Sequence, residues 1–262
     1  MDLFSVQGKT AVVTGGSRGI GYMIAEGLVR GGARVIISAR KAQACDEAAA
    51  RLSEFGSCES VPADLSTPEG ARGFAAAVRE RVGELNILVN NAGASWGAPV
   101  EDFPDSGWDK VLDTNVKSIW WLSVGLLEQL RTAARPGDPA RVINIGSIDG
   151  LRVPSMDNYS YSASKAAVHM LTRHLARRFA GDGITVNAIA PGPFESKMTA
   201  FFLSTPEQRE AVGANVPLGR IGEPDDVAGT TIFLASRAGA YLTGTVIPLD
   251  GGITGCNSGA GF

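Results

Sequence analysis

The chain has 262 residues, of which 44% are hydrophobic and 19% are charged, with a formal net charge of −3. This length and hydrophobic content allow one large α/β domain, and we expect a single domain over residues 1–262. The slight negative charge disfavours nucleic acid or an anionic membrane surface as a partner. No apolar run reaches the roughly 18 residues that a membrane-spanning helix needs.

The N-terminal residues lack the apolar core and cleavage site of a secretory signal, so we expect a cytoplasmic protein. Cys45, Cys58 and Cys256 form no CxxC pair, and unpaired thiols suit a reducing compartment. With only two histidines in the chain, no metal site is expected.

Short β-branched segments alternate along the chain with segments of helical periodicity. The predicted strands are Thr10–Thr14, Arg34–Ala39, Ser57–Pro62, Ile87–Asn90, Arg141–Ile145, Thr185–Ala190 and Val246–Leu249. The predicted helices are Ile20–Arg30, Ala42–Phe55, Pro68–Val82, Trp108–Ala134, Tyr161–Ala180 and Pro224–Ser236. Because parallel neighbours require crossover connections, this alternation predicts a doubly wound parallel α/β sheet, a Rossmann fold of about seven strands with helices on both faces. Ligands of such sheets bind beyond the carboxyl ends of the strands.

The first predicted strand runs directly into a glycine-rich turn, Thr14-Gly15-Gly16-Ser17-Arg18-Gly19-Ile20-Gly21, and a helix follows. Glycines at this spacing allow a tight turn and a close approach of the backbone to a pyrophosphate at the helix N-terminus. We therefore expect a dinucleotide to contact Gly15, Ser17, Arg18, Gly19, Ile20 and Gly21.

The end of the second strand indicates which dinucleotide binds. A site for NAD carries a carboxylate there for the ribose 2′-hydroxyl, whereas this sequence has Arg40 and no acid. Arg18 can reach the same place, and two guanidinium groups suit a 2′-phosphate. The pattern predicts NADP(H) over NAD(H); the alternative is that both arginines are ordinary surface residues.

Two further strand ends carry candidate cofactor contacts. Asp64-Leu65 follows the third strand, where the carboxylate either accepts a bond from an adenine amino group or belongs to a helix cap. Asn91-Ala92-Gly93 follows the fourth strand and suits packing against a nicotinamide ribose.

The fifth strand and the helix after it carry the candidate reacting groups. Tyr161 and Lys165 are four residues apart and share one helix face. A nearby ammonium favours the phenolate, so we expect Lys165 to lower the pKa of Tyr161. Ser147, at the strand end, is expected to bond the substrate oxygen. Tyr159, the rival proton donor, lies six residues before Lys165 on another face of the helix.

The order of these motifs resembles that of the short-chain dehydrogenase/reductase family over essentially the whole chain. Within the family, the chain is most similar to 3-oxoacyl-[acyl-carrier-protein] reductases, including the type associated with rhamnolipid synthesis. The resemblance implies that Asn115 completes a catalytic tetrad with Ser147, Tyr161 and Lys165, and that Lys165 also bonds the nicotinamide ribose. It further implies a homotetramer or dimer. The segment that it assigns to the nicotinamide carboxamide comprises Pro191, Gly192, Phe194 and Ser196, with serine where the family usually has threonine.

Several nearby residues admit two interpretations each. His169 either joins the proton relay or packs inside its helix, and packing is preferred. Asp149 either faces the pocket entrance or is an ordinary turn acid, which is preferred. Trp96 either lines the substrate pocket or does not. Trp120 and Trp121 are read as core or interface residues, and 201–203 as an apolar lid or a short packed helix.

These expectations combine into an NADPH-dependent reductase that converts a ketone, such as a 3-oxoacyl thioester, to a secondary alcohol with Tyr161 as general acid/base. One alternative is an NAD(P)-dependent dehydrogenase of a polyol, sugar or hydroxysteroid. An alternative of another class is a catalytically silent regulator that senses the cofactor.

Overall fold

The computed structural model describes residues 3–196 and 199–256 of the chain, without the side chain at position 202. In this part, seven parallel strands form one sheet in the order β3-β2-β1-β4-β5-β6-β7. The strands are β1 (Thr10–Thr14), β2 (Arg34–Ser38), β3 (Cys58–Ser60), β4 (Ile87–Asn90), β5 (Ala140–Ile145), β6 (Ile184–Pro191) and β7 (Val246–Leu249). The order reverses between β1 and β4, so the predicted doubly wound sheet is confirmed, with its switch point at these two strands.

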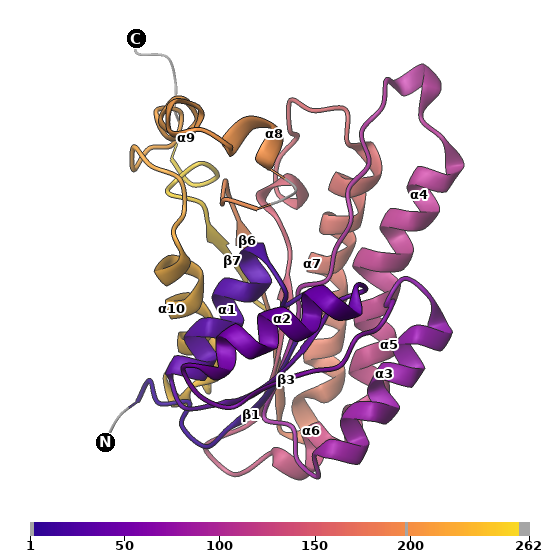
Figure 1. Cartoon of the computed structure of the whole chain (residues 1–262), viewed down its shortest axis with the longest axis vertical. Helices are drawn as coiled ribbons and strands as arrows, with labels where there is room; N and C mark the ends of the chain where they lie inside the picture. The colour runs from indigo at the N-terminus through magenta and orange to yellow at the C-terminus, as the bar shows by residue number, and fades with distance from the viewer. Residues whose placement is uncertain (1–2, 197–198, 257–262) are drawn as a thin grey trace.

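Helices cover both faces of the sheet (Figure 1). The helices of one face are α1 (Gly19–Arg30), α2 (Ala42–Ser53) and α10 (Pro224–Ala235). Those of the other face are α3 (Pro68–Arg81), α5 (Ser118–Gly125), α6 (Leu127–Ala133) and α7 (Tyr159–Phe179), with α4 (Asp105–Leu112) packed on α7.

Each strand divides its side chains between two separate cores, because successive residues of a strand point to opposite faces. Val12 of β1 and Ile36 of β2 belong to the core under α3, α5 and α7. Val13 and Ile37, the next residue of each strand, belong to the core under α1, α2 and α10. This double burial explains the nearly continuous apolar strands of the sequence.

The single helix predicted over Trp108–Ala134 is wrong. The chain forms α4, a π-helical turn η2 (Asp113–Lys117), α5 and α6 in succession. Near η2, the hydroxyls of Thr114 and Ser118 each donate to the carbonyl four residues earlier, a bond that often bends helices. At the end of α5, the carbonyl of Gly125 accepts a bond of 2.7 Å from Arg79 of α3.

Other boundaries differ by smaller amounts. The third strand is shorter than the predicted Ser57–Pro62, and α7 begins at Tyr159, two residues earlier than predicted. Two short helices, α8 (Ala200–Leu203) and α9 (Pro206–Gly213), lie between β6 and α10. Among residues 3–196 and 199–256, no helix has both the length and the hydropathy to cross a bilayer.

Candidate active site

A cleft of about 720 Å³ lies beyond the carboxyl ends of the strands, around the switch point. Nearly every predicted site residue lines it. The predicted residues that line it are Gly15, Ser17, Arg18, Gly19, Ile20, Gly21, Arg40, Asp64, Leu65, Asn91, Ala92, Gly93, Ser147, Tyr161, Lys165, Pro191, Gly192, Phe194 and Ser196. The exception is Asn115, which is buried behind the cleft.

The glycine-rich turn brings bare backbone to the cleft at the start of α1. Gly15 and Gly19 adopt positive φ values of 66° and 53°, which residues with a Cβ rarely take. A Cβ on Gly21 would lie 2.3 Å from the carbonyl oxygen of Gly15, so the helix can pack this close only with glycine there. The turn thus has the shape of an anion cradle at a helix N-terminus.

Hydrogen bonds tie the Asn91 loop to the glycine-rich turn. The Thr14 hydroxyl accepts bonds from the backbone amides of Asn91 (2.9 Å) and Ala92 (3.0 Å). The Asn91 amide group donates to the carbonyls of Thr14 (2.9 Å) and Gly15 (3.2 Å). These four hydrogen bonds therefore connect the end of β1 to the end of β4 within the cleft.

Arg18, Arg40 and Asp64, the residues predicted to contact the nucleotide, all line the cleft. Asp64 is not a helix cap, because Thr67 caps α3 by accepting a bond from the Gly70 amide. One oxygen of Asp64 accepts two bonds from Ser66, at 2.7 and 3.0 Å. These bonds and the charge of Arg40 hold the pKa of Asp64 below its usual value.

Ser147, Tyr161 and Lys165 meet at the other end of the cleft. Ser147 is buried at the start of a 3₁₀ turn, η3 (Ile148–Gly150), and its hydroxyl accepts a 3.1 Å bond from the Asp149 amide. The Lys165 ammonium lies 5.4 Å from the centre of the Tyr161 ring and donates a 2.8 Å bond to the Ile145 carbonyl. The three groups thus come together as the sequence predicts, and Tyr159 points to Asp157 instead.

The expected effect of Lys165 on Tyr161 is wrong for the protein alone. Burial raises the pKa of Tyr161 to about 12; a hydrogen bond with Ser147 opposes this rise and the charge of Asp149 adds to it. Burial also lowers the pKa of Lys165 to about 8, against the opposing effect of Asp149. Loss of hydration on burial is therefore the largest cause of both pKa shifts.

Asn115 lies in the π-helical turn and joins three elements. Its Oδ1 accepts from the Ala94 amide at 2.7 Å, and its Nδ2 donates to the Ala94 carbonyl at 3.0 Å and to the Ser164 hydroxyl at 2.9 Å. It therefore fixes the loop after β4 against α7, one residue before Lys165. π-turns of this kind often occur at functional sites.

His169 packs behind the turn that carries Ser147, and Asp149 is more than an ordinary turn acid. A Cβ on Gly146 or Gly150 would lie 2.2 or 2.8 Å from the His169 ring, so these two glycines on either side of Ser147 make room for it. Burial lowers the pKa of His169 to about 4, which leaves the imidazole neutral. Burial raises the pKa of Asp149, whose carboxylate also acts on both Tyr161 and Lys165.

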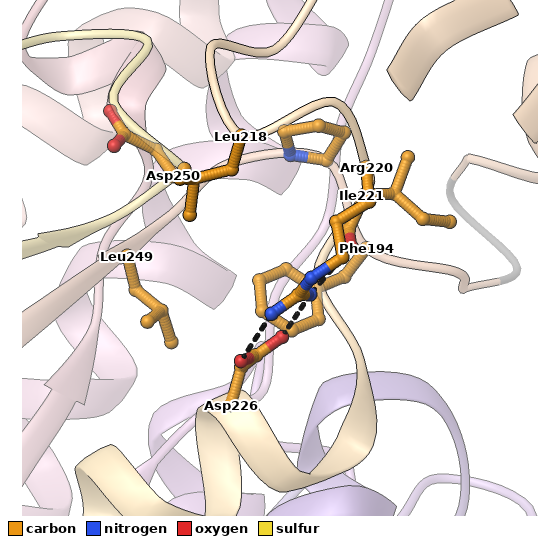
Figure 2. A pocket seen from close by; sticks show the side chains of 10 residues that line it. Phe194, Leu218, Arg220, Ile221, Asp226, Leu249 and Asp250 are labelled. Atoms are coloured by element: carbon orange, nitrogen blue, oxygen red, sulfur yellow. Dashed lines mark hydrogen bonds and ion pairs between the residues drawn. The ribbon is translucent and has the colours of Figure 1, made fainter. Parts of the chain in front are cut away.

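The segment after β6 also borders a second, smaller cavity of about 70 Å³ (Figure 2). The Phe194 ring is buried and lines both cavities. A Cβ on Gly222 would lie 2.2 Å from this ring, and the Gly222 amide donates to the Pro193 carbonyl at 2.9 Å. Arg220 and Asp226 close this cavity through two bonds of 2.6 and 3.0 Å.

Several residues that line the cleft were not among the predicted site residues. Lys110 of α4 and Thr199 before α8 line the cleft, as does Phe201 of α8. The Thr199 hydroxyl donates to the Phe194 carbonyl at 2.8 Å. The short helix expected as one interpretation of 201–203 is present, with Leu203 buried and Phe201 70% exposed. Trp96 lines the cleft, whereas Trp121 packs on the core and Trp120 is half exposed.

Comparison with known proteins agrees with this geometry. Residues 15–254 match the family model described as "Enoyl-(Acyl carrier protein) reductase". The rhamnolipids biosynthesis 3-oxoacyl-[acyl-carrier-protein] reductase of Pseudomonas aeruginosa is 52% identical over 95% of this chain and 97% of its own. The gluconate 5-dehydrogenase of Gluconobacter oxydans is 34% identical over 97% of each.

Among solved structures, the Pseudomonas aeruginosa RhlG/NADP active-site complex matches with a TM-score of 0.93 and 51% identity, covering 97% of this chain and 99% of that one. These matches cover nearly the whole chain, and the predicted motifs line one cleft. The chain belongs to the short-chain dehydrogenase/reductase family.

Proposed function

We propose that this protein is an NADPH-dependent reductase that converts the ketone of a 3-oxoacyl thioester to a secondary alcohol. The observation that carries the proposal is the meeting of Ser147, Tyr161 and Lys165 in the same cleft as the glycine-rich turn. The likeness to a 3-oxoacyl-[acyl-carrier-protein] reductase supports the substrate class.

The residues in and near the glycine-rich turn fit NADP(H). Glycine at 15, 19 and 21 keeps the turn tight, because a Cβ there would press on Asn91, Ser196 or the Gly15 carbonyl. Arg18 and Arg40 offer cations for a 2′-phosphate. Asn91, Pro191 and Phe194 would border the nicotinamide, and Lys165 would bond its ribose. When bound, the nicotinamide supplies the hydride.

The chain's own residues supply the proton and hold the carbonyl. Ser147 receives a bond from the Asp149 amide and bonds Tyr161 through its hydroxyl, which would turn to the substrate oxygen when the ketone binds. Because burial keeps Tyr161 protonated at neutral pH, its phenol is ready to donate to that oxygen as negative charge develops there. Lys165 beside it stabilises the phenolate that remains, and Asn115 fixes the surrounding loop.

A second candidate is a dehydrogenase of a sugar acid or polyol, because the chain is also 34% identical to a gluconate 5-dehydrogenase. A panel of 3-oxoacyl thioesters, gluconate and polyols with NADPH, NADH and their oxidised forms separates the two candidates. We expect the fastest turnover with NADPH and a 3-oxoacyl thioester.

Substitution of Tyr161 by Phe tests the chemistry. We expect Tyr161→Phe to lose nearly all ketone reduction while its affinity for NADPH, measured by nicotinamide fluorescence, stays within about twofold of the original. Tyr159→Phe is the matched control and should keep full activity. Unchanged turnover by Tyr161→Phe would overturn the proposed mechanism.

We further propose a homo-oligomer that covers α5 and works in the cytoplasm. α5 is apolar around most of its circumference, and its Trp120 and Val124 are about half exposed in the single chain. Cys45, Cys58 and Cys256 are free thiols, which suits a reducing compartment. Light scattering should show an oligomer that Trp120→Glu dissociates, and a monomeric original protein would refute this proposal.

A further inference from the structure

Trp96 lines the cleft, and its indole lies against Gly107 of α4, a residue without a side chain. A Cβ on Gly107 would lie 2.9 Å from Cγ, 3.0 Å from Cδ1 and 3.2 Å from Cδ2 of the indole. The ring therefore rests directly against the buried backbone of α4 at Gly107. Any side chain larger than glycine at 107 has to displace it.

Lys110, one helical turn after Gly107, holds the same ring. Its ammonium lies 5.0 Å from the centre of the indole, within the range of a cation–π contact. No carboxylate among residues 3–196 and 199–256 lies within ion-pair distance of Lys110, which leaves this ammonium to the indole.

The loop that carries Trp96 is anchored at both ends. Before Trp96, both backbone polar groups of Ala94 bond to Asn115. After it, the Ala98 amide donates a 3.2 Å bond to the Asp157 carbonyl, in the segment that leads into α7. Trp96 is thus a fixed part of the cleft and not part of a moving lid.

The indole supplies a large apolar surface in a cleft otherwise bordered mainly by small and polar residues. Half-buried and facing the cleft that also contains Ser147 and Tyr161, it retains apolar area for a substrate to cover. A polyol has no apolar chain to cover it, whereas the acyl chain of a 3-oxoacyl thioester does.

We propose that Trp96, seated on Gly107 and held by Lys110, is the platform on which the substrate's acyl chain packs, and that it sets the preference for chain length. This inference rests on the proposed function. Each methylene that contacts the indole adds affinity, so the benefit grows with the chain until the platform is covered.

The test is the chain-length profile of kcat and KM for acetoacetyl, 3-oxooctanoyl and 3-oxododecanoyl thioesters with NADPH. We expect Trp96→Ala to raise KM least for the acetoacetyl thioester and about tenfold for the longest chain, with kcat much less affected. Gly107→Ala, which displaces the ring without removing it, should change the profile in the same direction.

Trp108→Ala is the matched control. Trp108 is adjacent to Gly107 but contacts Phe103, outside the cleft, so this variant should keep the original profile. An equal rise in KM for all chains in Trp96→Ala, an unchanged profile, or faster turnover of the longest chain would each overturn the platform. If the original protein reduces no 3-oxoacyl thioester, the proposed function fails first and the platform fails with it.

Discussion

Asn115 binds Ala94 as one strand binds its neighbour, accepting from its amide and donating to its carbonyl through a single side chain. The same Nδ2 also donates to Ser164, the residue before Lys165. One side chain therefore sets the separation between the loop after β4 and α7, the helix that carries Tyr161 and Lys165. Removing it leaves both half-buried backbone polar groups of Ala94 without this partner.

We expect Asn115→Ala to lower kcat about a hundredfold, because small displacements of reacting groups have effects of that size. The affinity for NADPH should change much less, since the hydrogen bonds of Asn115 go to Ala94 and Ser164 and not to the glycine-rich turn. Stopped-flow reduction and nicotinamide fluorescence measure the two effects. Asp113→Asn, which removes a surface ion pair with Lys117 in the same turn, should leave both unchanged; equal losses in the two variants would contradict the prediction.

Asp149→Asn should shift the pH profile of alcohol oxidation to lower pH. The carboxylate disfavours the phenolate and favours the ammonium, so it raises the pKa of both Tyr161 and Lys165. Neutralising it lowers both, and the phenolate needed to accept the alcohol proton then forms at lower pH. The log of kcat/KM against pH measures this; Asp157→Asn, whose carboxylate bonds Tyr159 instead, is the control. A profile that stays in place or moves upward would refute the coupling.

Arg40→Ala should weaken selection for NADPH over NADH. Loss of a charged hydrogen bond to a 2′-phosphate is expected to lower kcat/KM for NADPH by about ten- to a hundredfold. The value for NADH should hardly change, because NADH lacks that phosphate. Lys41→Ala, at the adjacent exposed position outside the cleft, is the control. Parallel losses with both cofactors would mean that Arg40 does not read the phosphate.

His169 should make the protein sensitive to acid. Its pKa is about 4 in the folded chain against 6.5 for an ordinary histidine, so the unfolded chain binds more protons between these values. Stability therefore falls as the pH drops from 6.5 towards 4, by about 3 kcal/mol from this group at most.

Urea unfolding across that range measures the effect as a slope. We expect His169→Leu to flatten the loss of stability with falling pH, whatever its stability at neutral pH. His174→Leu is the control, because His174 is exposed on the same helix. If both variants lose stability as steeply as the original protein, His169 is not the titrating group.

The sequence predicts the sheet and the groups at its strand ends because these depend on local patterns. The turn at Gly15–Gly21 needs glycine for stereochemical reasons, and Tyr161 and Lys165 share a helix face through spacing alone. α9 also carries a local signal, because Thr205 and Gln208 form a capping box at its start.

Features that depend on tertiary contacts were not predictable in this way. At the end of α5, Gly125 bonds Arg79 of a different helix, and Asn115 of the π-turn bonds Ala94 of the loop after β4. The pKa of Tyr161 follows burial, which spacing from Lys165 does not report. The residues that hold Trp96 likewise come from α4 and could not be read from the Trp96 loop.

The π-turn at Asp113–Lys117 changes how length variation in this region should be read. Each added helical residue rotates everything after it by about 100°, so the wider turn sets the angular offset between α4 and α5. Loss of one residue from 113–117 would let α4 continue into α5 as one regular α-helix. The side-chain amide of Asn115 would then point away from Ala94. A gap there in an alignment of relatives would mark a rebuilt reaction centre and not a trimmed surface helix.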